Sequence, residues 1–163
     1  MSFLSNFLII SLWHYFILIL VTQPEYKFYY RECVQTDIRF FIKKEKFYEK
    51  VLMIKKWKDL IPQYVSKSGF SKKKMVSLKI DYIKKFIAET YRAELDHLFC
   101  CFVIPIIFFL NTAKLSIILS TIVIICNLPC IIIQRYNRLR LRHLMLKMNN
   151  KKKLINYNFS ENN

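Results

Sequence analysis

The sequence carries a carboxylate and an imidazole three residues apart, at Glu94 and His97. Residues at this spacing are neighbours on the surface of an α-helix, so the two side chains can meet there. An imidazole titrates close to neutral pH, which makes this pair a candidate for proton transfer to or from a substrate. The alternative is a buried ion pair that only fixes the packing of helices.

Amide and guanidinium side chains form a second polar group between Asn127 and Arg138. At about 100° per residue, Asn127, Gln134 and Arg138 share one face of a helix. The arginines at the end of this group can bind phosphate in fork geometry, although anchoring at a membrane surface accounts for part of them equally well. These arginines are Arg135, Arg138, Arg140 and Arg142.

One helix is predicted from Leu78 to Leu98, and it places Glu94 on an apolar face. Ile83, Ile87 and Tyr91 recur at helical spacing on the same stripe as this carboxylate. An ionisable group among apolar residues at membrane depth is costly, and it is a functional candidate for that reason.

Three uncharged stretches precede or separate these polar groups, and together they predict an all-α membrane protein. About 20 apolar residues cross a bilayer as a helix, and backbone groups in lipid need internal partners. We expect a single domain over residues 1–163, and the short connection Asn111–Lys114 predicts that its last two spans form an antiparallel hairpin. This hairpin would bring Gln134–Arg138 beside Glu94 and His97. The expected transmembrane helices cover residues 3–22, 91–110 and 115–134, and the second begins before its uncharged stretch, Leu98–Leu110.

The 27 Lys and Arg residues are unevenly distributed around these helices. Residues 23–97 hold 18 of them, the part after Ile133 holds 8, and the hairpin turn holds Lys114 alone. Cytoplasmic segments carry the excess of basic residues, so we expect a multi-pass protein of the cell membrane with its N-terminus outside and the tail 135–163 in the cytoplasm. The alternative for residues 3–22 is a cleaved signal, but no basic residue precedes this stretch.

The basic cytoplasmic loop 23–90 is predicted to contain an interfacial helix from Arg39 to Lys58 that contacts membrane lipid. Its apolar residues recur at near-helical spacing among lysines, although solvation explains any single lysine equally well. Nucleic acid is not an expected partner, because aromatic residues accompany these lysines in a membrane-tethered chain. The tail from Met148 to Asn163 is expected to be unstructured. The apolar residues of the interfacial helix are Phe40, Phe47, Val51, Ile54 and Trp57.

The glycine and cysteine content argues against several further kinds of site. The single Gly argues against a glycine-rich phosphate loop, and the sequence has no Cys-x-x-Cys pair, so neither a zinc ribbon nor a disulfide framework is indicated. We expect no metal and no cofactor. His14 is expected to pack or to bond a backbone carbonyl. The cysteines within apolar stretches are interpreted as small hydrophobic residues rather than nucleophiles; they are Cys100, Cys101, Cys126 and Cys130.

Two blocks of the sequence resemble the glycosyl-4,4'-diaponeurosporenoate acyltransferase family. The first block is Arg92–His97, followed by Pro105–Phe108, and the second is Asn127–Arg138, with a shorter similarity at Lys56–Lys58. The resemblance implies a small membrane enzyme that esterifies the sugar of a glycosylated carotenoid acid with a fatty acyl group. This reaction is the last step of staphyloxanthin-type pigment synthesis.

The chemistry of the polar residues predicts their roles in such a reaction and its partners. The partners would be a glycosylated carotenoid acceptor and a fatty acyl thioester donor. His97 would be the general base on the sugar hydroxyl, and Glu94 would orient its imidazole. The expected substrate-binding residues are Asn127 or Gln134 for the developing oxyanion, Arg135 and Arg138 for phosphate of the donor, and Tyr136 and Asn137 between them. The rival hypothesis is a non-catalytic membrane subunit or lipid-binding scaffold.

Overall fold

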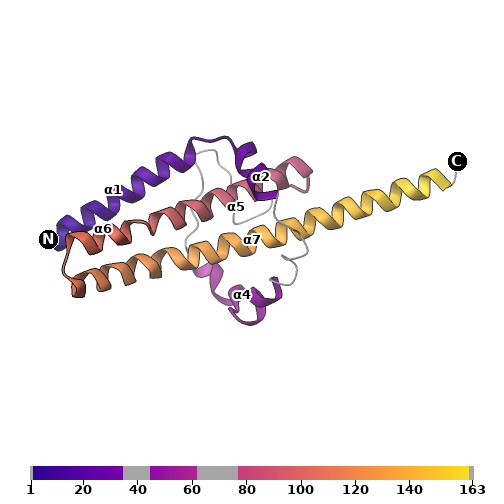
Figure 1. Cartoon of the computed structure of the whole chain (residues 1–163). Helices are drawn as coiled ribbons and strands as arrows, with labels where there is room; N and C mark the ends of the chain where they lie inside the picture. Colours follow the sequence, from indigo (N-terminus) through magenta and orange to yellow (C-terminus); the bar gives the residue numbers. More distant parts are fainter. Residues whose placement is uncertain (1, 35–44, 62–76, 162–163) are drawn as a thin grey trace.

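The computed structural model describes residues 2–34, 45–61 and 77–161, and every regular element in these ranges is helical, as predicted. Three long helical segments lie side by side, and the last of them extends beyond the others to the C-terminus (Figure 1). The N-terminus lies beside the hairpin turn between α6 and α7 (Figure 1). The elements are α1 (Phe3–Thr22), α2 (Tyr26–Val34), α4 (Ile54–Trp57), η1 (Lys58–Leu60), α5 (Ile80–Cys100), α6 (Val103–Leu110) and α7 (Ala113–Glu161).

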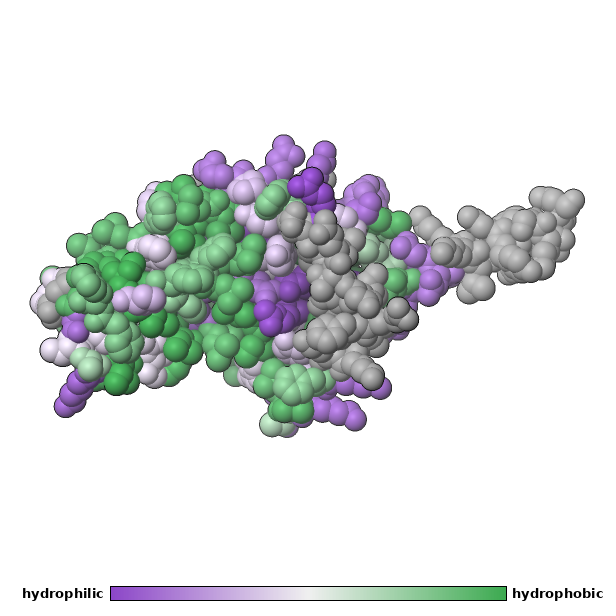
Figure 2. All heavy atoms as spheres, in the orientation of Figure 1, coloured by the Kyte–Doolittle hydropathy of each residue, from purple (hydrophilic) through white to green (hydrophobic). Residues whose placement is uncertain are grey.

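The three predicted membrane helices are present, and each is long and apolar enough to cross a bilayer. The candidate spans are Phe3–Thr22, Ile80–Leu110 and Ala113–Lys151. Large apolar side chains cover their outer surfaces, and Phe109 is 90% exposed. Figure 2 shows this apolar surface over the end of the molecule that holds the N-terminus and the hairpin turn, while hydrophilic residues gather over the other half. Apolar surface of this extent requires a cover such as lipid.

The second span is interrupted at Cys101 and Phe102, between α5 and α6. Pro105 has no backbone N–H, and its ring would clash with the carbonyl of Cys101 in a continuous helix. The Cys101 carbonyl instead accepts a hydrogen bond from the backbone N–H of Ile104, at 3.1 Å. Pro105 therefore accounts for the interruption. Pro129 lies inside α7, and the helix continues on both sides of it.

Neutral hydrogen bonds fasten α1 to the hairpin near its turn. The side chains of Asn6 and Asn111 bind each other reciprocally, at 3.0 and 2.7 Å. The indole N–H of Trp13 donates to the carbonyl oxygen of Phe99 at 3.1 Å. These bonds hold α1 against α5 and α6 and so leave its other side facing α7.

The core of the molecule lies between α5 and α7, which pack against each other in antiparallel directions. One buried cluster joins Ile83, Phe86 and Ile87 of α5 to Leu141 of α7. α2 packs on the other side of α5, where the hydroxyl of buried Tyr29 donates to the Val21 carbonyl at 2.8 Å. The apolar stripe of α5 predicted from the sequence is thus placed against α7.

The predicted interfacial helix from Arg39 to Lys58 is wrong in its described part, and residues 39–44 lie outside the described ranges. Residues 45–50 are helical, but a turn follows and Met53 has a left-handed conformation, with φ of 44°. This reversal splits the expected apolar face: Val51 is 61% exposed, whereas Ile54 is fully buried against α7 in a cluster with Ile133. Contact with α7, rather than with lipid alone, therefore orders this segment.

The expectation of an unstructured tail from Met148 is also wrong. α7 continues to Glu161, so only the last two residues lie outside the described ranges. The chain has no Gly after position 69 and no Pro after Pro129, so no residue that normally ends a helix follows the arginines.

Candidate active site

Glu94 is buried in the interface between α5 and α7, with 3% of its surface exposed. Ile83 and Ile87, on the same stripe of α5, are fully buried. The placement of this carboxylate on an apolar face, predicted from helical spacing, is therefore confirmed.

Two arginines of α7 pair with Glu94. The Nε atom of Arg135 donates to Oε1 of the carboxylate at 2.7 Å, and Arg138 forms an ion pair with Oε2. Arg138 is itself buried, and its guanidinium carbon lies 5.2 Å from the centre of the Tyr91 ring. Pairing offsets the cost of burying these charges. Because two guanidinium groups face one carboxylate, the cluster retains one net positive charge.

His97 is held by Asn127 of α7. Nδ1 of His97 lies 2.9 Å from Oδ1 of Asn127, and Nδ2 of Asn127 donates to the Val123 carbonyl at 2.9 Å. The second bond fixes the orientation of the amide, so its oxygen faces the imidazole. Since an amide oxygen only accepts, Nδ1 of His97 carries the proton. In the neutral ring Nε2 is then the nitrogen with the lone pair, and it has no hydrogen-bond partner among the described residues.

The contacts of Glu94 differ from the sequence prediction. Glu94 was expected to orient His97, but its carboxylate binds Arg135 and Arg138, and the residue bound to the imidazole is Asn127. The reason is that α5 and α7 run antiparallel. A residue of α5 that lies closer to the hairpin turn therefore contacts a residue of α7 that is also closer to the turn and has a lower number. His97 therefore faces the amide of α7, and Glu94 faces its arginines.

Among the described residues, none of the other predicted substrate-binding residues forms a hydrogen bond or ion pair with Glu94. Gln134 is buried, and its Oε1 atom has no hydrogen-bond partner among the residues that the structure describes. Asn137 is partly exposed. Tyr136 is fully buried, and its hydroxyl donates to Oε1 of Glu49 at 2.8 Å. Hydrogen bonds from Lys55 and then from Tyr136 hold the pKa of Glu49 below its usual range.

Sequence reasoning missed two contacts of this site. Tyr91 was counted only as an apolar residue, although it lies three residues before Glu94 on the same stripe, where its ring meets Arg138. Glu49 gave no signal, because its contact with Tyr136 joins segments far apart in the sequence.

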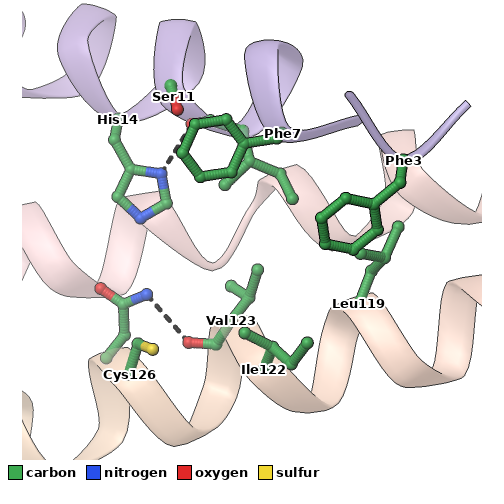
Figure 3. Close-up of a pocket in the computed structure, with 10 residues that line it drawn as sticks. Phe3, Phe7, Ser11, His14, Leu119, Ile122, Val123 and Cys126 are labelled. Carbon is green, nitrogen blue, oxygen red and sulfur yellow. Dashed lines mark hydrogen bonds between the residues drawn. The ribbon is translucent and has the colours of Figure 1, made fainter. Parts of the chain in front are cut away.

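His14 bonds a backbone carbonyl, as predicted: its Nδ1 atom lies 2.8 Å from the carbonyl oxygen of Ile10. The ring projects from α1 into a cavity between α1 and α7 (Figure 3). Asn127, which binds His97, lines the same cavity. The side chain of Asn127 therefore connects the candidate site with an apolar cavity.

The described cysteines make local contacts that fit their interpretation as small hydrophobic residues. The thiol of Cys101 donates to the His97 carbonyl at 3.4 Å, and that of Cys130 donates to the Cys126 carbonyl at 3.7 Å. Both bonds run to the preceding helical turn, and neither joins a thiol to the imidazole ring.

The fold defines a small helical protein of membrane type. Its candidate site combines a carboxylate–guanidinium cluster with an imidazole–amide pair, between the apolar and the charged parts of the hairpin. The model of the family described as glycosyl-4,4'-diaponeurosporenoate acyltransferase matches residues 26–147, which is well over half of the chain. The chain therefore belongs to the glycosyl-4,4'-diaponeurosporenoate acyltransferase family. The matched region includes both polar groups and begins after α1.

Curated relatives carry the same description. Glycosyl-4,4'-diaponeurosporenoate acyltransferases of Staphylococcus aureus strains MRSA252, USA300 and COL are each 34% identical to this chain over 108 residues. The match covers 64% of this chain and 64% of each relative, so it spans slightly less than two thirds of their length. No solved structure matches the chain.

Proposed function

We propose that this chain is a membrane acyltransferase that transfers a fatty acyl group to the sugar of a glycosylated carotenoid acid. Membership of the acyltransferase family supports the reaction and the acceptor. The three apolar helices support action on substrates dissolved in a membrane. A fatty acyl thioester is the donor class that we propose, because its carbonyl carbon is activated and its carrier contains phosphate.

The observation that carries the mechanism is the hydrogen bond from His97 Nδ1 to Asn127. It leaves Nε2 as the basic nitrogen, which is the tautomer required of a general base. An amide that fixes the tautomer of a catalytic imidazole serves the same purpose as the third member of Cys-His-Asn sites. We therefore assign His97 as the base and Asn127 as its positioning residue.

The proposed reaction transfers the acyl group directly from the thioester donor to the sugar hydroxyl. The sugar hydroxyl loses its proton to Nε2 of His97 while its oxygen attacks the thioester carbonyl carbon. A new carbon–oxygen bond forms, the carbon–sulfur bond breaks, and the proton passes from His97 to the departing thiolate. The products are the acylated glycoside and the free thiol of the donor carrier. No covalent acyl-enzyme is required.

We assign Glu94 to the arginines rather than to the imidazole. Its buried carboxylate holds Arg138 and the partly exposed Arg135, so it positions two guanidinium groups. The net positive charge of this cluster supports binding of donor phosphate, and fork geometry suits a guanidinium for this purpose. Gln134, with a buried amide oxygen free of described partners, and the nearby Asn137 remain proposed substrate contacts.

The proposed orientation places this site at the inner surface of the cell membrane. Most Lys and Arg residues lie in residues 23–97 and after Ile133, whereas the hairpin turn has Lys114 alone. The N-terminus would then be outside and the C-terminus in the cytoplasm. Protease protection of tags fused to the two ends of the chain in sealed membranes tests this orientation, and equal protection of both tags would contradict it.

The decisive experiment is mass spectrometry of lipid extracts from cells supplied with the glycosylated carotenoid acid. Cells that express the chain should contain the acylated glycoside, and cells with an empty vector should not. The competing function is a non-catalytic membrane subunit, which the buried ion pair of Glu94 favours as a packing element. Absence of the acylated product, with the chain inserted in the membrane, would favour that subunit.

The role of Asn127 has its own test. In Asn127→Asp, a carboxylate beside His97 would favour the protonated imidazole. A general base acts when deprotonated, so the acidic limb of the pH–rate profile should move to higher pH. Gln23→Glu, a change of the same kind at an exposed position, is the control. An unmoved profile with normal insertion would remove Asn127 from its proposed role.

A further inference from the structure

A cavity of about 500 Å³ lies between α1 and α7, in the apolar half of the molecule (Figure 3). This volume falls within the range of about 300–1,000 Å³ that is typical of small-molecule sites. Among the described residues that line it, none is Lys, Arg, Asp or Glu. Figure 3 shows Phe3, Phe7, Leu119 and Ile122 around one part of the cavity and His14 at the other.

The packing of α1 explains why this cavity exists. The Asn6–Asn111 pair and the Trp13–Phe99 bond fasten α1 to α6 and α5. Ile17 and Val21, further along α1, are buried against α2 and α5. Toward α7, the lining residues Phe3 and Phe7 of α1 remain 67% and 63% exposed.

The dimensions of the cavity fit one lipid chain. Its lining runs along α7 from Leu119 to Asn127, which is a rise of ~12 Å at 1.5 Å per residue. A bilayer has a hydrocarbon core of ~30 Å, so one leaflet of acyl chains is about half of that. A flexible chain of that length fits this lining, whereas a rigid conjugated polyene that extends across the membrane would project beyond it.

The polar end of the cavity is joined to the candidate active site. Asn127 lines the cavity and binds Nδ1 of His97 through its amide oxygen. A carbonyl group at this end would lie near the imidazole, and the chain attached to it would extend toward the Asn6–Asn111 pair.

We propose that the cavity between α1 and α7 holds the acyl chain of the thioester donor and sets which chain lengths are transferred. This assignment rests on the proposed function, because it requires the acyl carbonyl to react beside His97. The family match begins at residue 26, so the wall formed by α1 is not part of the matched region. Selection of acyl chain length by α1 is therefore inferred for this chain and not for the family.

The test compares two tryptophan variants of exposed isoleucines on α7. Ile122→Trp fills the cavity, because Ile122 lines it and is 48% exposed. Ile125→Trp is the matched control, because Ile125 is 64% exposed and is not among the lining residues. Membranes that contain each variant receive a mixture of lauroyl-, myristoyl-, palmitoyl- and stearoyl-coenzyme A with the glycosylated acceptor, and products are quantified by mass spectrometry.

Each methylene that can no longer be buried should weaken binding about fourfold. The ratio of palmitoyl to lauroyl product should therefore fall on the order of tenfold or more in Ile122→Trp and stay near the wild-type value in Ile125→Trp. Equal profiles in the two variants, with an active wild type, would overturn the cavity assignment and leave the proposed function standing. So would a rise in the acceptor KM of Ile122→Trp without a change in chain profile, because that result would assign the cavity to the carotenoid.

A labelling experiment tests the cavity without requiring turnover. Palmitoyl-coenzyme A with a diazirine at its terminal carbon is photolysed with the full chain in membranes, and the labelled peptides are identified. We expect label on the segments that contain Phe3, Phe7 and Leu119, and at least tenfold less of it after addition of excess palmitoyl-coenzyme A. A pattern identical to that of a diazirine-labelled phospholipid would overturn the proposal. A wild type that is labelled at the cavity but transfers no acyl group would instead refute the proposed function.

Discussion

Different kinds of interaction join the helices at the two ends of the hairpin, the end with the turn and the end with the charged residues. At the turn end, Asn6 binds Asn111, and the hydroxyl of Ser116 donates to the Ile107 carbonyl at 3.1 Å. At the charged end, Glu94 binds Arg135 and Arg138. Neutral amides and hydroxyls cost little to bury once bonded, whereas charges are stable at depth only in pairs.

This difference indicates where chemistry can occur in the molecule. Neutral groups join the helices at the turn end, where the hairpin turn carries Lys114 as its charged residue. At the charged end, the cluster of Glu94 with Arg135 and Arg138 retains one net positive charge, which an anionic substrate group can approach. His97 and Asn127 lie between the two ends, with an imidazole nitrogen left unbonded by the described residues. A substrate with an apolar chain and an anionic head would match both ends at once.

The largest expected effect comes from His97→Gln, which removes the basic nitrogen between the two ends. Removal of a general base lowers turnover by about 10²–10⁴-fold. Turnover of the acceptor in membranes should fall by that amount while the quantity of inserted protein stays constant. His143→Gln is the control, because His143 pairs with Glu45 at 3.1 Å, away from the site. Equal turnover in wild type and His97→Gln would exclude His97 as the base.

Glu94→Gln should destabilise the charged end, because it leaves two guanidinium groups without their carboxylate. Loss of one partner of a buried ion pair costs about 3–5 kcal/mol. Thermal denaturation of the detergent-solubilised full chain measures this loss. Asp81→Asn on the same helix should change stability little, since the Asp81 side chain is 95% exposed. If both variants melt at the same temperature, the ion pair does not stabilise the hairpin.

Asn111→Leu removes the Asn6–Asn111 pair at the turn end. It should lower the free energy of unfolding by less than Glu94→Gln does. The amide of Asn6, which is 1% exposed, would lose its partner at a cost of about 1–3 kcal/mol. The double variant Asn6→Leu with Asn111→Leu should recover most of this loss, because no buried amide is then left unpaired. Additive losses in the double variant would show that the two amides do not act as a pair.

Tyr136→Phe should have the smallest effect, because it removes one hydroxyl at the edge of the charged end. Loss of the hydrogen bond to Glu49 should lower the melting temperature slightly. Glu49 has a lowered pKa in the folded chain, so its stabilisation is present above its ordinary pKa and is lost as pH falls through the folded value. The difference in melting temperature between Tyr136→Phe and wild type should therefore shrink in acid. A constant difference across pH would contradict this linkage.

The spacing of apolar residues was enough to predict α5 and the burial of Glu94. Both follow from local geometry, because a stripe with helical periodicity must face a neighbour. The partner of each polar group was harder to predict. Glu94 and His97 are adjacent on α5, and their separate partners depend on the register of α5 against α7, which helical spacing does not contain.

The segment of residues 45–61 shows the same limit. Its apolar residues were spaced for one helix, but a left-handed Met53 turns Ile54 into the cluster with Ile133 and leaves Val51 exposed. Burial against α7 outweighs the local preference for a continuous helix, and this contact lies far away in the sequence.

The sequence by itself determined three apolar helices, a short hairpin turn and an excess of positive charge at the other end, because each depends on neighbouring residues. Tertiary structure decided that Asn127 holds His97, that Glu94 holds the arginines, and that α1 leaves a cavity beside α7. These features depend on how helices dock, and docking is set by side chains distant in the chain that meet only after folding.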